Sequence, residues 1–289
     1  MPLPDFDLHG RVAFVTGAGR GIGKGIAQAL AEAGADVVIN SLTDKHVTGL
    51  ASDIAKATGR RVVPLVADVT KSAEVDGAIS RIIKDFGALH VLVNNLGDSI
   101  RKPLVPLPDH EGKDGPLTDE EYRLILDLNL TEAVLCTRAV GPHMLARRSG
   151  KIINIGSFAS TRGGVDLTIY AAAKTALVGF TRALALEWAP YGIQVNCLVP
   201  GLFPHEDEVA AIRAVPERGQ RESSRAPAGR VGRPRELGWA ATFLASPFAA
   251  YVTGHTLVVD GANWQRRAML QPEFVPIREQ MGKGPFTLE

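Results

Sequence analysis

The chain has 289 residues, of which 45% are hydrophobic and 22% are charged, as in soluble globular proteins and unlike disordered ones. Its 32 basic and 31 acidic side chains leave a net charge of +1, which argues against a general affinity for nucleic acid or for acidic membranes. Cys136 and Cys197 are too few for a disulfide framework or a thiolate metal cluster, and the length suits one large α/β domain or two small ones.

Short runs of Val, Ile and Leu alternate along the chain with amphipathic segments. The runs lack polar alternation, which is typical of strands covered on both faces of a parallel sheet. Gly34, Gly59 and Gly87 end three of the amphipathic segments, as expected of helices. We expect strands at residues 12–16, 37–40, 62–67, 91–95, 151–155, 193–199 and 256–259, and helices at 21–33, 44–58, 72–86, 118–147 and 168–189. This alternation predicts the α/β class, with a doubly wound, seven-stranded parallel sheet of Rossmann type in a single domain.

A glycine-rich turn, Thr16-Gly-Ala-Gly-Arg-Gly-Ile-Gly23, joins the first strand to the first helix. Glycine lets the backbone approach a pyrophosphate, and the helix N-terminus offers free N–H groups and a positive dipole end. A G-x-G-x-x-G motif would need glycine in place of Ile22, and a P-loop would need other residues than Ala18 and Gly25. The spacing T-G-x-x-x-G-x-G remains, so the turn predicts a dinucleotide site, with a plain glycine-rich connection as the alternative.

Further motifs follow the same order as in the classical short-chain dehydrogenase/reductase family, which the chain resembles over residues 8–264. Asn94-Asn-Leu-Gly97 ends the fourth strand, and Tyr170 and Lys174 form a Y-x-x-x-K pair. The motif style is most similar to that of 3-oxoacyl-thioester reductases. The resemblance implies one coenzyme-binding and catalytic domain at residues 1–264, followed by an extension at 265–289. It implies a coenzyme site formed by Gly17, Arg20, Gly21, Ile22, Gly23, Asn40, Ser41, Asp68, Val69, Asn95, Gly97, Tyr170, Lys174, Pro200, Gly201 and Phe203.

The resemblance also implies a catalytic set of Asn129, Ser157, Tyr170 and Lys174. Tyrosine, with an ordinary pKa of about 10, is a poor acid–base group at neutral pH. Lys174 lies one helical turn after Tyr170, so we expect its ammonium to lower the pKa of that phenol. Ser157 would polarise the substrate oxygen, and Asn129 would hold a water that links Lys174 to solvent. Taken singly, these residues also fit ordinary surface or core positions.

The end of the second strand bears on the choice between NAD and NADP. In the family an acidic residue there holds the ribose 2′-OH and repels a 2′-phosphate. Ser41 stands where an aspartate would favour NAD, and Arg20 can face the phosphate, so we predict NADP(H). Leu42 stands where many NADP-dependent relatives carry a basic or hydroxyl residue, so NAD(H) is the alternative.

By resemblance, residues 201–233 form a lid over the substrate. His205 stands where the family often has a threonine that contacts the nicotinamide, and it either reaches substrate or lies in solvent. Seven arginines within residues 213–235, among them Arg221 and Arg225, fit an acidic or carrier-bound partner or a solvated surface. Candidate substrate residues, by position, are Asp98, Ser99, Phe158, Arg162 and His205.

The leading functional prediction is an NADP(H)-dependent oxidoreductase that interconverts a ketone and a secondary alcohol, acting on a small molecule. The alternatives are an NAD-dependent sugar, polyol or alcohol dehydrogenase, an epimerase or dehydratase, and a non-catalytic coenzyme-binding sensor. Epimerases and dehydratases usually have longer substrate domains, and sensors tend to lose the tyrosine or lysine of the pair. The histidines lack metal-ligand spacing, so we expect no metal.

The helix expected at residues 168–189 is apolar or small around most of its circumference. One face covers the sheet, so the other needs a partner, and we predict a homodimer or homotetramer. The first residues do not resemble a secretory signal, and the helix carries Arg182 and Glu187, so we expect a cytoplasmic protein without a membrane span.

The chain is longer than the family usually requires. Residues 98–117 are rich in proline and follow the fourth strand, so we expect them to border the substrate entrance. Residues 265–289 contain several large apolar side chains, so we expect them to pack on their own or a neighbouring subunit.

Overall fold

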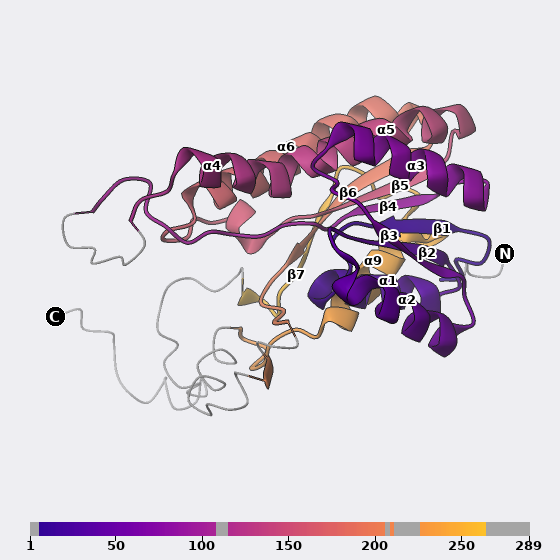
Figure 1. The fold of residues 1–289 in the computed structure, drawn as a ribbon, viewed down its shortest axis with the longest axis horizontal. Helices are drawn as coiled ribbons and strands as arrows, with labels where there is room; N and C mark the ends of the chain where they lie inside the picture. The colour runs from indigo at the N-terminus through magenta and orange to yellow at the C-terminus, as the bar shows by residue number, and fades with distance from the viewer. Residues whose placement is uncertain (1–5, 108–114, 206–208, 211–225, 264–289) are drawn as a thin grey trace, which may run out of the picture.

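The computed structural model describes residues 6–107, 115–205, 209–210 and 226–263, drawn as coloured ribbon in Figure 1. Seven parallel strands form the middle layer, in the order β3-β2-β1-β4-β5-β6-β7. The strands are β1 (Val12–Val15), β2 (Asp36–Ser41), β3 (Val62–Val66), β4 (Val91–Asn94), β5 (Gly150–Ile155), β6 (Ile193–Pro200) and β7 (Thr256–Val259). The predicted strands are confirmed and differ only at their ends. The strand order reverses between β1 and β4, and a ligand site is expected outside the carboxyl ends of the strands at that point.

Helices cover both faces of the sheet (Figure 1). One face carries α1 (Gly21–Glu32), α2 (Asp44–Thr58) and α9 (Pro234–Ala245). The other carries α3 (Ser72–Phe86), α5 (Glu132–Arg147) and α6 (Thr168–Trp188), with α4 (Asp119–Leu126) packed against α6. Short helical turns are η1 (Asp127–Thr131), η2 (Phe158–Ser160), η3 (Ala189–Tyr191) and η4 (Pro247–Ala249). Each face therefore has its own apolar core against the sheet.

The helix predicted at 118–147 is divided by a π-helical turn. Thr118 begins α4 with a capping box, because its hydroxyl accepts from the Glu121 N–H and the Glu121 carboxylate accepts from the Thr118 N–H. The turn η1 then separates α4 from α5. Sequence periodicity did not predict this turn, and π turns within α-helices are frequent at functional sites.

Helix α9 was not predicted from the sequence, although Pro234 at its first position and Glu236 in its first turn are typical start signals. It packs against α1, and the two helices approach closely at glycines. A Cβ on Gly25 would lie 2.6 Å from the Pro234 carbonyl oxygen, and one on Gly238 would lie 2.5 Å from the Gly25 oxygen. This contact fixes the start of α9 beside the glycine-rich turn that precedes α1.

Residues Thr168–Tyr191 are long and apolar enough to cross a bilayer by length and composition alone. In the structure, however, α6 packs along β6, and Leu177, Leu184 and Ala185 are buried in the domain. We therefore describe α6 as a core helix of the domain.

Several predicted segments lie outside the described residues in whole or in part. The lid predicted at 201–233 is described at 201–205, 209–210 and 226–233, so Arg221 and Arg225 fall outside it. Residues 108–114 of the proline-rich segment and the extension 265–289 also lie outside. The packing proposed for them remains a prediction.

Candidate active site

The glycine-rich turn lies between β1 and α1 and has backbone conformations that favour glycine. Gly17 and Gly21 have φ values of 59° and 55°, in the left-handed region. A Cβ on Gly23 would lie 2.5 Å from Asn95 Nδ2 and 2.7 Å from the Gly17 oxygen. A glycine turn that leads into a helix N-terminus suits a dinucleotide pyrophosphate, so the turn fits a dinucleotide coenzyme.

Two predicted coenzyme residues hold this turn in place. Asn95 donates from Nδ2 to the Thr16 oxygen at 2.9 Å and to the Gly17 oxygen at 3.1 Å. Asn40 is buried, and its Oδ1 accepts from the Gly17 N–H at 3.3 Å while Nδ2 donates to the Ala67 oxygen at 3.0 Å. Both amides are therefore occupied by backbone groups, and they shape the loop.

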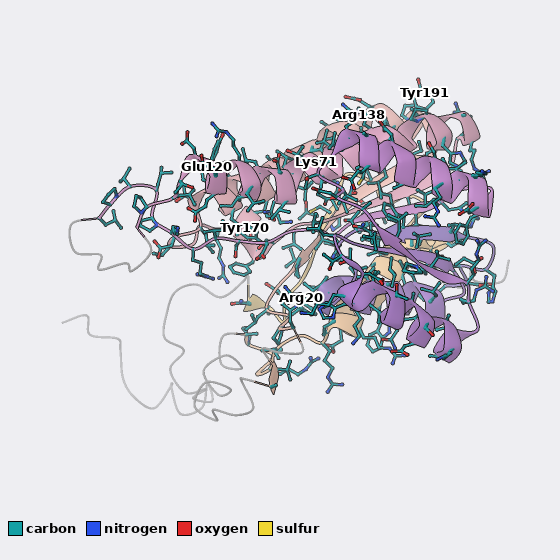
Figure 2. All side chains as sticks on the ribbon, viewed as in Figure 1. Arg20, Lys71, Glu120, Arg138, Tyr170 and Tyr191 are labelled. Carbon is teal, nitrogen blue, oxygen red and sulfur yellow. The ribbon has the colours of Figure 1, made fainter. Side chains whose placement is uncertain are left out.

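The residues predicted to meet the adenosine half lie at the ends of β2 and β3. Ser41 ends β2, and its Oγ lies 3.5 Å from the position of a Cβ on Gly19. Burial raises the pKa of Asp68, but hydrogen bonds from the Thr70 hydroxyl and N–H outweigh it and lower that pKa overall. Val69 is buried, and Ile22 packs against the core. Arg20 is exposed and immediately precedes α1, as Figure 2 shows.

Tyr170 and Ser157 meet at the carboxyl end of β5. Ser157 follows that strand, its Oγ accepts from the Ala159 N–H at 3.1 Å, and it lies close enough to Tyr170 to lower the pKa of the phenol. Tyr170 lies in the first turn of α6. Figure 2 shows it on the α6 side of the sheet, whereas Arg20 lies on the α1 side. The structure thus places the phenol and the serine hydroxyl at the same end of the sheet.

Lys174 and Asn129 lie behind this pair, around Gly97. Lys174 Nζ is 6.0 Å from the centre of the Tyr170 ring and donates to the Ile155 oxygen at 2.9 Å. Asn129 is buried in η1, and its Nδ2 donates to the Asp98 oxygen at 2.7 Å. A Cβ on Gly97 would lie 2.7 Å from Asn129 Oδ1 and 3.0 Å from Lys174 Nζ. The two polar groups therefore face one point, which only glycine leaves open.

The predicted direction of the Tyr170 pKa shift is wrong for this arrangement. Burial raises the pKa of Tyr170, the charge of Asp98 raises it further, and the Ser157 hydrogen bond and the charge of Arg101 only partly oppose this. Lys174 Nζ is bonded to the Ile155 oxygen instead. Burial also lowers the pKa of Lys174 to about 8, against the opposing charge of Glu132.

Two residues that the sequence reasoning did not select act on this group. Arg101 lies close enough to Tyr170 for its charge to lower the pKa of the phenol. Glu132 is 1% exposed, and its charge acts on Lys174. The sequence signals were an arginine four residues after Gly97 and a glutamate three residues after Asn129 on a helix.

The substrate candidates are divided between two places. Asp98 is exposed after β4, and its carboxylate accepts from the Ser99 N–H at 2.7 Å. Arg162 lies with its guanidinium carbon 5.3 Å from the centre of the half-buried Phe158 ring. His205 is elsewhere, because its ring packs against Gly21 of the glycine turn. It therefore lies beside the glycine turn.

The end of β6 forms the base of the predicted lid. Gly201 donates its N–H to the Val259 oxygen at 2.9 Å, and a Cβ there would lie 2.6 Å from Asp260 Cβ. Pro200 ends β6, and the ring of Phe203 is buried against Gly232. These contacts anchor the chain where it leaves the sheet.

The chain is similar to known proteins over most of its length. A family model described as enoyl-(acyl carrier protein) reductase matches residues 17–262. The chain is 38% identical over 255 residues to 3-oxoacyl-(acyl-carrier-protein) reductase of Vibrio harveyi, covering 88% of this chain and 98% of that protein. It is 37% identical over 256 residues to 5-keto-D-gluconate 5-reductase of Escherichia coli, covering 89% of this chain and 96% of that protein.

A solved structure is similar over the same extent. Gluconate 5-dehydrogenase from Burkholderia cenocepacia, in complex with NADP and tartrate, matches with a TM-score of 0.79 and 37% identity. The match covers 91% of this chain and 98% of that one.

Proposed function

Because this chain belongs to the classical short-chain dehydrogenase/reductase family and is an NAD(P)-dependent oxidoreductase acting on CH–OH or keto groups, we propose that Tyr170 is its general acid/base. The proposed reaction interconverts a ketone and a secondary alcohol by hydride transfer. The observation that carries this proposal is the meeting of Ser157 and Tyr170, with Lys174 behind them, at the sheet edge that holds the glycine turn. A non-catalytic sensor would have no need of this arrangement.

The chemistry divides between coenzyme and protein. A bound nicotinamide supplies or accepts the hydride. Tyr170 gives its proton to the substrate oxygen in the reductive direction and takes it back in the oxidative one. Ser157, fixed by the Ala159 N–H, donates a hydrogen bond to the same oxygen. Lys174 and Asn129 Oδ1, which face one point beside Gly97, form the path by which a proton returns to the phenol.

We assign NADP(H) as the coenzyme. Ser41 ends β2 without a charge that would repel a 2′-phosphate, and Arg20 is exposed immediately before α1. His205, packed against Gly21, adds a nitrogen-bearing ring on the same side of the site. The gluconate 5-dehydrogenase structure, solved in complex with NADP, supports this assignment; NAD(H) is the alternative.

The substrate class that fits best is a ketone carrying an acid or thioester group. The relatives named above act, by their names, on a 3-oxoacyl carrier-protein thioester and on 5-keto-D-gluconate. The charge of Arg101 at Tyr170 supports a substrate with a carboxylate near its reacting carbonyl. An NAD-dependent sugar or polyol dehydrogenase is the alternative.

A single assay tests the function. Oxidation of NADPH, and separately of NADH, is measured with a 5-keto sugar acid, a 3-oxoacyl thioester, an uncharged sugar ketone and an enoyl thioester. We expect reduction of an acidic or thioester ketone, with a higher kcat/KM for NADPH, and no reduction of the enoyl double bond. Reduction of the enoyl thioester alone would contradict the proposal.

We further propose a cytoplasmic homodimer or homotetramer. The outward face of α6 carries an exposed stripe of small or apolar residues beside the polar Thr175, Arg182 and Glu187, and Leu186 in this stripe is 81% exposed. This stripe comprises Ala172, Ala176, Gly179, Ala183 and Leu186. An apolar helix face of this kind favours pairing with a second copy.

A further inference from the structure

The segment of residues 98–103, which follows β4, is bonded through its backbone to the helices beside the site. At one end, Asn129 Nδ2 of η1 donates to the Asp98 oxygen at 2.7 Å. Near the other end, the Lys102 N–H donates to the oxygen of Asp166, which lies in the turn before α6, at 3.1 Å. The segment is therefore fixed at one end to η1 and near its other end to the start of α6.

The side chain of Lys102 adds an ion pair with α4, the helix that packs against α6 (Figure 1). Lys102 Nζ lies 2.6 Å from Oε1 of Glu121, in the first turn of α4, and the two side chains are 17% and 25% exposed. The hydrogen bond from Lys102 lowers the pKa of Glu121, so the carboxylate is ionised at neutral pH. Because solvent screens a partly covered pair less than an exposed one, this pair can hold the segment in place.

The carboxylate of Glu121 is itself held by the start of α4. Its Oε2 accepts from the Thr118 N–H at 2.9 Å, and the Thr118 hydroxyl accepts from the Glu121 N–H at 3.2 Å. Next to this cap, the Leu117 N–H donates to the Pro103 oxygen at 2.9 Å. One carboxylate oxygen therefore caps the helix, while the other is directed at Lys102.

Charged residues of this segment lie at the proposed acid/base. Burial raises the pKa of Tyr170, and the charges of Asp98 and Arg101 act on that pKa in opposite directions. Arg101 directly precedes Lys102 in the chain. The backbone bond from Lys102 reaches Asp166, four residues before Tyr170. The contacts that fix the segment therefore also place it beside the phenol.

We propose that Lys102 and Glu121 are positioning residues, whose ion pair holds residues 98–103 as a wall of the ketone site beside Tyr170. The pair acts through the segment and takes no part in proton or hydride transfer. Without it, part of the binding free energy of the ketone would be used to order the segment, so the affinity for the ketone would fall while the bound ketone would react as before. This inference rests on the proposed function of Tyr170.

The test is the separation of KM from kcat in Glu121→Gln, with a 5-keto sugar acid or a 3-oxoacyl thioester, whichever the wild type reduces better. Glutamine removes the charge but still caps the helix, since capping boxes use glutamate or glutamine. The KM for the ketone should rise roughly three- to tenfold, whereas kcat, the Kd for NADPH and the thermal midpoint should change little. Glu120→Gln neutralises an exposed carboxylate on the same turn (Figure 2), so it is the matched control and should keep the wild-type KM.

Lys102→Met removes the other member of the pair, leaves the helix cap intact, and serves also if Glu121→Gln does not fold. It should raise KM to the same extent, and the double variant should be no worse than either single one, because both substitutions remove one interaction. A wild-type KM in the single variants, KM effects that multiply in the double variant, or a loss confined to kcat would overturn the inference. A wild type that reduces no ketone would instead refute the proposed function itself.

Discussion

At the scale of single residues, burial decides how the polar groups of the site behave. Lys174 is 3% exposed and Asn129 is 1% exposed, so neither can rely on water for its hydrogen bonds. Lys174 uses the Ile155 oxygen, and Asn129 uses the Asp98 and Ile125 oxygens through Nδ2. These fixed bonds leave Asn129 Oδ1 and Lys174 Nζ facing one point beside Gly97, which explains why a side chain cannot be placed there.

The assignment of NADP(H) as the coenzyme rests on Ser41. In Ser41→Asp, a carboxylate at the end of β2 would repel a 2′-phosphate and accept from a ribose hydroxyl. We expect the ratio of kcat/KM for NADPH to that for NADH to fall by roughly tenfold or more. Steady-state kinetics with both coenzymes measures it.

Ser41→Asn is the control for that substitution, because it has the shape of aspartate without the charge. It should keep most of the wild-type preference. A wild type that prefers NADH, or a Ser41→Asp variant with an unchanged ratio, would speak against NADP(H).

The sequence predicted which residues meet at the site but not all of their energetics. Ser157, Tyr170 and Lys174 each stand in a motif at the end of a strand or the start of a helix, so their meeting followed from the parallel sheet. The raised pKa of Tyr170 depends on burial and on the charge of Asp98, which comes from a different loop. The roles of Asn40 and Asn95 as supports of the glycine turn likewise depend on contacts between segments distant in sequence.

At the scale of elements, the site depends on how helices are attached to the sheet. The π turn η1 brings Asn129 and, three residues later, Glu132 into the interior of the domain. Behind the site, Asn94 Nδ2 donates to Asn154 Oδ1 at 2.8 Å, and Asn154 Nδ2 donates to Thr181 Oγ1 at 2.9 Å. This buried chain of side-chain hydrogen bonds ties β4 and β5 to α6, the helix that carries Tyr170.

The close packing of α1 on α9 leads to a stability prediction. Gly25→Ala should destabilise the protein by about 1–3 kcal/mol, because the new methyl group would meet the backbone of Pro234. Chemical denaturation measures the change in the free energy of unfolding.

A glycine-to-alanine substitution in α2 should have the opposite effect on the free energy of unfolding. Gly49 is exposed, and a Cβ there would have no neighbour within 4 Å. Gly49→Ala should therefore stabilise the protein by about 0.5–1 kcal/mol through helix propensity and loss of chain entropy. Equal effects of the two substitutions would contradict the described packing.

Strands and most helices were predictable because a buried parallel sheet leaves continuous apolar runs, and glycine marks the helix ends. Helix α9 was missed because its start signals, Pro234 and Glu236, follow the arginine-rich segment that the resemblance assigned to the lid. The π turn could not be predicted, since Asp127–Thr131 continues the periodicity of α4 and α5. A local sequence pattern therefore identifies a helix but does not reveal a π-helical turn within it.

At the scale of the whole molecule, the parallel sheet places every predicted site motif at one edge. Strand order reverses between β1 and β4, so the glycine turn and Gly97 are neighbours although they are far apart in sequence. Within the described part of the chain, the outward face of α6 includes an exposed stripe of small and apolar residues. The proposed assembly would therefore use the same helix that carries Tyr170 and Lys174.

Ala183→Arg tests that assembly. A long charged side chain on the outward face of α6 should prevent close approach of a second copy, so light scattering should show a smaller particle than the wild-type dimer or tetramer. Ala57→Arg places the same side chain on the exposed surface of α2 and should leave the mass unchanged. A monomeric wild type, or an Ala183→Arg variant of wild-type mass, would contradict the proposed interface.

The central claim is that Tyr170 carries the proton in ketone reduction, and Tyr170→Phe tests it most directly. The phenyl ring keeps the shape of the side chain but removes the hydroxyl that lies beside Ser157. With the ketone and coenzyme that the wild type uses best, kcat should fall by roughly a hundred- to ten-thousandfold. The affinity for NADPH, followed by its fluorescence, should stay close to that of the wild type. A Tyr170→Phe variant that reduces the ketone at the wild-type rate would contradict the account.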